Sequence, residues 1–319
     1  MVSRNLSVNC HICEKPPVIE LQHGALCKPH FLHYFEDKVF STIAKYRLIS
    51  RGDRICVATS GGKDSQTVLY LTKKYLEAHQ IPATIEALAI DEGISGYREK
   101  TLVDLKDFCL QQEVPLTIVT FADAENLGKP LDEAYPIINK DTKKKPCNVC
   151  GVWRRYLLNY HAKKKMATKL VTGHNLDDEA QATIMNVFKA NTSLAARLGP
   201  ISGSEEHEEF VQRVKPLYFC TEKEVRLYAL LRGFTIQFAE CPYSKEGYRH
   251  EIQEMLNTFE QKYPGTKQGI INSFLALLPM LKQEQGKKEI KSCAYCGEAA
   301  NKDICQACAM KEVLHAKVG

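Results

Sequence analysis

The sequence predicts an α/β protein built on a parallel sheet, with small metal-binding modules at both ends. Two observations support this. Short apolar segments alternate with amphipathic segments from Arg54 onward, and both ends of the 319-residue chain are rich in cysteine. Strands that alternate with helices are typical of parallel sheets buried on both faces. A hydrophobic content of 44% is enough for such a core.

The individual elements follow from periodicity and breakers. Strands are predicted at residues 55–58, 84–90, 116–121 and 169–172, with weaker ones at 215–217 and 234–238. Helices are predicted at residues 36–49, from a glycine-rich turn to about 79, and at 98–112, 152–165, 177–190, 222–231 and much of 247–281. Ligands of such sheets bind beyond the carboxyl ends of the strands.

We expect five regions along the chain. They are an N-terminal zinc finger (1–35), a connecting helix (36–50), a central catalytic domain (51–245), a helical linker (246–290) and a C-terminal zinc ribbon (291–319). The chain has neither a long apolar stretch nor a secretory signal, so we expect a cytoplasmic protein that binds no membrane. In that reducing compartment, clustered cysteines bind metal more often than they form disulfides.

The most specific motif is Ser60-Gly61-Gly62-Lys63-Asp64-Ser65, between a predicted strand and a predicted helix. Glycines let the backbone approach a phosphate, and the helix N-terminus attracts its charge. The serines add hydroxyl donors and Lys63 adds charge, whereas Asp64 suits the site only if it binds magnesium or orients the loop. An ordinary strand–helix turn is the alternative, but the complete hexapeptide in this context favours a phosphate site.

A second polar segment, Gly173 to Glu179, follows the strand at 169–172. Paired carboxylates beside a phosphate site suit magnesium. The alternative is helix capping, because Asn or Asp at a helix start satisfies free N–H groups. We expect both, with Asn175 or Asp177 as the cap and Asp178 as the catalytic carboxylate.

The terminal cysteines are spaced for two zinc sites. One set is Cys10, Cys13, Cys27 and His30, and the other is Cys293, Cys296, Cys305 and Cys308. Two closely spaced pairs of sulfur or imidazole ligands are the tetrahedral zinc pattern, and a closed four-ligand site is structural.

Cys147 and Cys150 form a different pair, because no second pair is adjacent. The lysines and arginines around them are expected to lower the thiol pKa values. Three interpretations remain open from the residues alone: a redox or persulfide pair, ligands of an iron–sulfur cluster, or inert thiols. Cys241 is the best distant partner and Cys220 the other candidate. Three thiolates leave one iron of a 4Fe-4S cluster open to inorganic sulfide.

Basic clusters accompany these motifs at residues 143–145, 154–155, 163–165 and 287–288, and an acidic run covers 205–209. A single lysine run is usually a solvated face. Three basic clusters close to a candidate active site favour contact with a nucleic-acid backbone.

The hexapeptide resembles the signature of the PP-loop ATPase superfamily, whose members cleave ATP between the α and β phosphates. Over essentially the whole chain, the sequence is similar to the tRNA 2-thiouridine synthetases of the TtuA and NcsA type. The shared motifs include the two metal patterns, residues 60–65, 91–98, 147–151, 173–178 and 240–243, and Cys305 to Cys308.

The resemblance implies ATP, magnesium, a 4Fe-4S cluster and two zinc ions as cofactors. It places the nucleotide against Ala58, Thr59, residues 60–65, Ile90, Arg154, Gly173 and Asp178. It assigns Cys147, Cys150 and Cys241 to the cluster, and Asp178, Lys63 and Arg154 to catalysis together with these three cysteines.

We therefore expect 2-thiolation of a tRNA uridine, with the wobble position favoured over the T-loop. The uridine oxygen is adenylated by ATP and then replaced by sulfide held on the cluster. The sulfur donor is sulfide or a thiocarboxylated ubiquitin-like carrier, and the family suggests a homodimer. The alternatives are a PP-loop amidating or ligating enzyme and a non-catalytic zinc-finger RNA adaptor.

Overall fold

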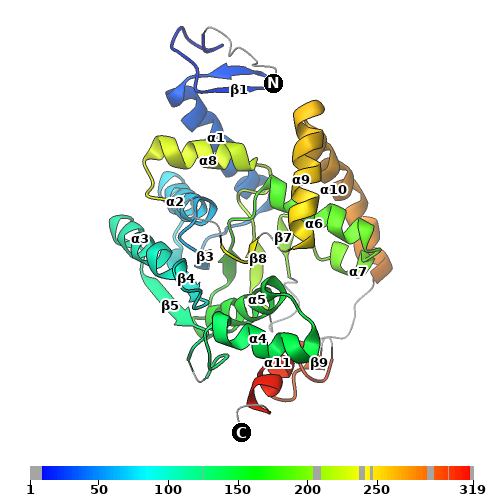
Figure 1. Ribbon diagram of the computed structural model, residues 1–319. Helices are drawn as coiled ribbons and strands as arrows, with labels where there is room; N and C mark the ends of the chain where they lie inside the picture. Colours follow the sequence, from blue (N-terminus) through cyan, green and yellow to red (C-terminus); the bar gives the residue numbers. More distant parts are fainter. Residues whose placement is uncertain are drawn as a thin grey trace.

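The structure is a computed structural model that describes residues 9–123, 125–203, 210–236, 241–244, 247–285, 291–300 and 302–316. Its centre is a six-stranded sheet of order β5-β4-β3-β6-β8-β7 (Figure 1). The strands are β3 (Arg54–Thr59), β4 (Thr84–Asp91), β5 (Leu116–Thr120), β6 (Lys169–Val171), β7 (Ile201–Ser202) and β8 (Gln212–Val214). Neighbours are parallel except β7, which is antiparallel to β8.

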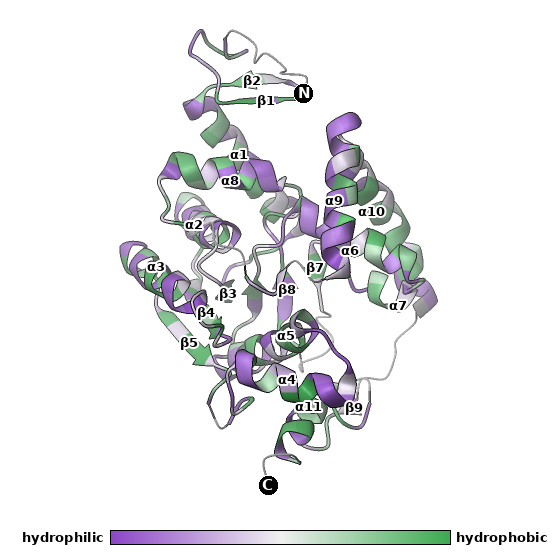
Figure 2. Cartoon of the chain, in the orientation of Figure 1, coloured by the Kyte–Doolittle hydropathy of each residue, from purple (hydrophilic) through white to green (hydrophobic). Residues whose placement is uncertain are grey.

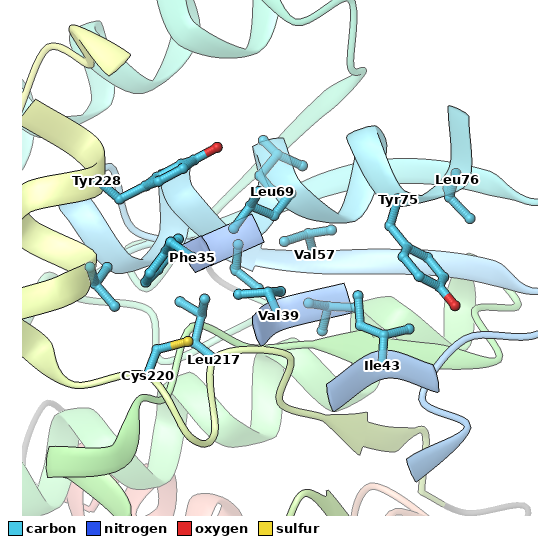
Figure 3. Close-up of a cluster of buried hydrophobic side chains, with 14 of the residues drawn as sticks. Phe35, Val39, Ile43, Val57, Leu69, Tyr75, Leu76, Leu217, Cys220 and Tyr228 are labelled. Carbon is cyan, nitrogen blue, oxygen red and sulfur yellow. The ribbon is translucent and has the colours of Figure 1, made fainter. Parts of the chain in front are cut away.

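Helices cover both faces of this sheet. The helices of the described segments are α1 (Lys28–Tyr46), α2 (Lys63–Ala78), α3 (Arg98–Gln111), α4 (Leu131–Thr142), α5 (Pro146–Lys164), α6 (Leu176–Phe188), α7 (Thr192–Ala195), α8 (Glu222–Arg232), α9 (Tyr248–Lys262), α10 (Thr266–Gln285) and α11 (Gln306–His315). Side chains alternate along β3, as a strand requires. Val57 packs among α1, α2 and α8 (Figure 3), whereas Cys56 belongs to the core beneath α4 and α5. The predicted α/β architecture is confirmed.

A short hairpin lies near each end of the chain, and the two hairpins lie on opposite sides of the molecule in Figure 1. They are β1 (Ile19–Leu21) with β2 (Gly24–Leu26), and β9 (Lys291–Ser292) with β10 (Ala299–Ala300). The C-terminal hairpin is anchored by Glu298, which accepts hydrogen bonds from Asn159 at 2.8 Å and Lys163 at 2.9 Å. In Figure 2, α9 is largely hydrophilic, whereas α11 shows hydrophobic colour where it lies near α4.

Several predicted boundaries move. Helix α1 begins at Lys28 and α5 at Pro146, so His30 and the Cys147–Cys150 pair lie near the starts of these helices. The strand predicted at 215–217 is wrong: the strand is β8, and Pro216 cannot donate to a ladder. The strand predicted at 234–238 is also wrong over its described part, because Phe234 closes the end of α8 through a hydrogen bond to Ala229. Residues 237–238 lie outside the described part.

Helix α4 was not predicted. Pro136 lies inside it, and proline normally argues against a helix interior. Among the described residues, none of the helices is long and apolar enough to cross a membrane.

Candidate active site

Three loops meet at the carboxyl edge of the sheet. They follow β3 (residues 60–62), β4 (residues 92–97) and β6 (residues 172–175). Because β4 and β6 lie on either side of β3, the connections diverge at this point and leave room for a ligand. The sheet therefore brings together the segments predicted to bind the nucleotide, including Ala58, Thr59 and Ile90.

The phosphate loop, residues 60–65, is shaped by backbone constraints. Gly61 has a φ of +82°, and a Cβ at this position would lie 2.4 Å from the carbonyl oxygen of Thr101. Ser65 accepts a hydrogen bond from the Ser60 N–H at 3.1 Å and donates to the Gly62 carbonyl at 2.9 Å. Gly62 starts α2 without a side-chain cap. The first N–H groups of α2 thus remain available for an anion.

Lys63 and Asp64 connect this loop to its neighbours. Asp64 accepts hydrogen bonds from Asn175 Nδ2 at 2.9 Å and from Lys63 Nζ at 3.0 Å. Burial alone would lower the pKa of Lys63, but Asp64 and Glu222 outweigh it and raise the pKa, so the ammonium stays charged. A Cβ on Gly173 would lie 2.9 Å from the Asp64 backbone, so glycine is needed where the loops touch. Asp64 therefore orients the loop, one of its two predicted roles.

Asp178 lies in the first turn of α6. Asn175 caps this helix by accepting from the Asp178 N–H at 3.1 Å, and Asp178 Oδ2 accepts in return from the Asn175 N–H at 3.2 Å. The cap is thus Asn175, whereas Asp177 forms a buried ion pair with Lys267. Burial raises the pKa of Asp178 to about 6, opposed by Arg249 and reinforced by Asp64. Asp64 and Asp178 are close enough to sense each other's charge, as joint ligands of a magnesium ion would be.

Arg98 is a buried residue of this site to which the sequence assigned no role. Its guanidinium donates to the Ser60 carbonyl at 2.6 Å and to the Ile90 carbonyl at 2.6 Å. It also forms an ion pair with Glu92 at 2.9 Å, and Glu92 lies 3.7 Å from Arg154. Arg98 therefore ties the loop after β3 to the end of β4. The only signal in the sequence was its place at the end of the 91–98 motif.

The three-cysteine group comprises Cys147, Cys150 and Cys241. The first two are three residues apart at the start of α5, so they share a helix face. The Cys147 thiol donates to the Tyr243 carbonyl at 3.2 Å, which places the Cys241 loop beside α5. Burial raises the pKa of Cys150 to about 12, with Arg154 opposing and the two other thiols adding to the shift. The expectation of a lowered pKa is wrong for Cys150, because desolvation outweighs the nearby cations.

The spacing of the sulfurs distinguishes two kinds of metal site. Tetrahedral zinc with 2.3 Å bonds holds its thiolates about 3.8 Å apart. Across the described segments, two groups have all ligand atoms within 4.8 Å of one another, and they are the two predicted zinc sets. The Sγ atoms of Cys13 and Cys27 are 3.7 Å apart, and those of Cys296 and Cys305 are 3.8 Å apart. Cys147, Cys150 and Cys241 are not among these closely spaced groups, so they do not form a third closed tetrahedral site in the described segments.

Cations surround the same edge of the sheet. The pKa of His174 is lowered well below its ordinary range, first by burial and then by Lys215, Arg249, Arg154 and Arg213. Such a concentration of positive charge suits the phosphates of a nucleotide or a nucleic acid.

The basic cluster at 163–165 does not belong to this edge. Lys163 binds Glu298 in the C-terminal module, and Lys165 forms an ion pair at 2.6 Å with Glu86, near the start of β4. They lie at the far end of α5, so proximity in sequence to the active site was misleading. Residues 205–209 and 287–288 lie outside the described segments. Cys220 is buried in the core between α1 and α8 and joins no metal group there (Figure 3).

Comparison with known proteins agrees with this geometry. A family described as a PP-loop domain matches residues 32–242. The tRNA-5-methyluridine(54) 2-sulfurtransferase of Pyrococcus horikoshii is 38% identical over 303 residues, covering 94% of this chain and 93% of that protein. The cytoplasmic tRNA 2-thiolation protein 1 of Caenorhabditis elegans is 34% identical, covering 95% and 79%.

Among solved structures, the U34-tRNA thiolase NcsA of Methanococcus maripaludis with its [4Fe-4S] cluster is 31% identical. The match covers 97% of both chains with a TM-score of 0.80. On the sequence match, the fold and the arrangement of the three loops, this chain belongs to the PP-loop family of tRNA 2-thiolation proteins and tRNA 2-sulfurtransferases.

Proposed function

We propose that this protein replaces O2 of a tRNA uridine with sulfur while cleaving ATP to AMP and diphosphate. One observation carries the proposal: the phosphate loop and the three-cysteine group lie at the same edge of one sheet, connected through Arg98, Glu92 and Arg154. The relatives named as tRNA 2-sulfurtransferase and thiolation proteins support this reaction.

The phosphate loop and the start of α6 would bind the nucleotide. The free N–H groups at the start of α2 and the Lys63 ammonium bind the departing diphosphate, and Asp64 and Asp178 hold magnesium. Arg154 stabilises the charge that develops at the α-phosphorus during attack. The uridine O2 attacks this phosphorus, diphosphate leaves, and the C2 carbon becomes susceptible to a sulfur nucleophile.

The three-cysteine group fits a 4Fe-4S cluster in donor type, because three thiols from α5 and the adjacent loop lie near one another. When bound, such a cluster supplies a fourth iron without a protein ligand, where a sulfur atom is held for transfer. Cys147 and Cys150 on α5 and Cys241 in the loop after residue 240 would hold this cluster beside the nucleotide site. Sulfur attack at C2 releases AMP, and the base must leave its stacked position to reach this site.

We propose that the protein acts in the cytoplasm as a homodimer and that its terminal modules are structural zinc sites. We also propose that the modified uridine is the one at the wobble position. The whole-chain similarity to a U34-tRNA thiolase supports this position. Because a relative with 38% identity is named for uridine 54, the T-loop is the second candidate. Sulfide or a thiocarboxylated carrier protein would supply the sulfur.

The test is an anaerobic reaction of the purified protein with tRNA, ATP and sulfide. Mass spectrometry of nucleosides should show 2-thiouridine, oligonucleotide mapping should locate it in the anticodon, and AMP should form in equal amount. An amidating or ligating enzyme would keep its activity after joint replacement of Cys147, Cys150 and Cys241 by alanine. An RNA adaptor would bind tRNA without forming AMP. Either result would exclude the proposal.

A further inference from the structure

Asp132, in the first turn of α4, connects two loops that the motifs treat separately. Its Oδ1 accepts a hydrogen bond from the Tyr243 hydroxyl at 2.8 Å, and its Oδ2 accepts one from the Ser95 N–H at 2.9 Å. Ser95 belongs to the loop after β4, and Tyr243 lies two residues beyond Cys241. Each oxygen of one carboxylate therefore holds one loop.

The bond to Tyr243 restrains the Cys241 loop. Through its carbonyl, Tyr243 also accepts from the Cys147 thiol at 3.2 Å, and its ring lies 6.0 Å from that of Tyr135 on α4. The loop is thus attached to α4 by a hydroxyl and to α5 by a carbonyl. The neighbours of this loop at 237–240 and 245–246 lie outside the described segments.

The bond to Ser95 restrains the nucleotide side. The Leu131 N–H donates to the Glu92 carbonyl at 2.8 Å, and a Cβ on Gly93 would lie 2.5 Å from Pro130. The start of α4 therefore packs directly against the loop after β4. Glu92 in that loop pairs with Arg98, which in turn holds the phosphate loop.

We propose that Asp132 is a positioning residue that sets the separation between the nucleotide loops and the three-cysteine group. The inference rests on the proposed function, in which sulfur must reach a carbon activated at the nucleotide site. Misplacement of such groups by about 1 Å is enough to slow a reaction roughly a hundredfold. Asp132 performs this role by holding Tyr243 and Ser95 without touching the reacting atoms.

The test compares Asp132→Ala, Asp132→Asn and Tyr243→Phe in the full-length protein purified anaerobically. Glu133→Ala is the matched control, because Glu133 is the next residue on α4 and makes an exposed ion pair with Lys129. The readouts are iron per chain, the rate at which a chelator bleaches the cluster absorbance, and the affinity for ATP. Loss of one hydrogen bond to a charged group should accelerate bleaching at least about fivefold in Asp132→Ala and Tyr243→Phe.

Asparagine can accept from Ser95 and donate to the Tyr243 oxygen, so Asp132→Asn should bleach at the wild-type rate. ATP affinity should fall in Asp132→Ala and stay unchanged in Tyr243→Phe. The Asp132→Ala/Tyr243→Phe double variant should bleach no faster than either single variant, as expected for one shared interaction. If both single variants bleach like Glu133→Ala, Asp132 has no positioning role. A wild-type protein without iron would instead refute the proposed function.

Discussion

Arg249 donates a hydrogen bond at 2.8 Å to Oδ1 of Asp178. The Nε of Arg249 donates to Gln181 Oε1 at 2.7 Å, so Arg249 binds two side chains of α6. Arg249 lies in the first turn of α9, outside the 32–242 segment that matches the PP-loop family. A helix beyond the segment that matches the PP-loop domain therefore supplies a charge to the candidate nucleotide site.

This contact gives a prediction about pH. Arg249 holds the pKa of Asp178 down against the dominant effect of burial, which leaves it at about 6. Removing the guanidinium in Arg249→Gln should raise that pKa, so more of the carboxyl is protonated near neutrality. If Asp178 acts as the ionised magnesium ligand, the acid limb of AMP formation should move to higher pH, with recovery above pH 8. Arg249→Lys, which keeps the charge, should stay near the wild-type profile. If the acid limb does not shift in Arg249→Gln, Arg249 does not influence the ionisation that limits activity.

The ionised form of Asp178 should lower the stability of the fold near neutral pH although the reaction requires it. Its folded pKa of about 6 lies above the unfolded value of about 3.9, so folding favours the protonated form. The associated stability is fully present below pH 4 and is lost as pH rises through 6. Asp178→Asn should therefore raise the thermal midpoint at pH 7.5 by about 2 °C, with the difference vanishing near pH 4. Thiolation should fall by roughly a hundredfold or more.

The neighbouring residue provides the control for this experiment. Asp177 forms a buried ion pair with Lys267 and accepts from the Glu222 N–H at 2.7 Å. Asp177→Asn leaves a buried ammonium without its counter-charge, so it should lower the thermal midpoint at pH 7.5. Calorimetry on both variants across pH 4 to 8 measures the contrast. A loss of stability at pH 7.5 in both would show that Asp178 is held mainly by its hydrogen bonds.

Gly61 and Gly52 have similar backbone conformations but different space for a side chain, so substituting each distinguishes steric clash from backbone strain. Their φ angles are +82° and +80°, but a Cβ on Gly61 would lie 2.4 Å from the Thr101 carbonyl, whereas a Cβ on Gly52 meets nothing within 4 Å. Gly52→Ala should cost about 1 kcal/mol for the left-handed conformation and leave ATP binding intact. Gly61→Ala should cost more and weaken ATP binding at least tenfold, because the phosphate loop must move. Denaturant titration and ATP titration test this, and equal effects of the two substitutions would contradict it.

The sequence identified the parts of this site that are local in the chain. The turn between β3 and α2 and the helix start at Asn175 depend on residues within a few positions of each other, and both are confirmed. The ligand atoms of each predicted zinc set also lie together. Spacing and residue type were sufficient there.

The residues that connect those parts were not predicted. Asp132 and Tyr243 are 111 positions apart, and Arg249 and Asp178 are 71 apart. Such contacts depend on how α4 and α9 dock, which local patterns do not encode. The pKa of Cys150 was predicted in the wrong direction for a related reason: charge density is visible in a sequence, but the burial that outweighs it is not.

The C-terminal module gives a prediction about metal and the stability of α5. Glu298 binds Asn159 and Lys163, so the module is attached to the helix that presents Cys147 and Cys150. Cys305→Ser should remove one of the two zinc ions expected from the two ligand sets. Because short metal-bound modules lose their fold with the metal, backbone hydrogen exchange should then increase in the second half of α5.

Cys13→Ser is the matched variant at the other end, where the proposed zinc ligands Cys27 and His30 lie at the start of α1. It should also lose one zinc ion but increase exchange at the start of α1, leaving α5 protected. Metal content by plasma mass spectrometry and exchange by peptide mass analysis measure both effects. If exchange in α5 rose equally in both variants, the loss would reflect general unfolding. The specific attachment of the C-terminal module to the cysteine-bearing helix predicts that only Cys305→Ser affects α5.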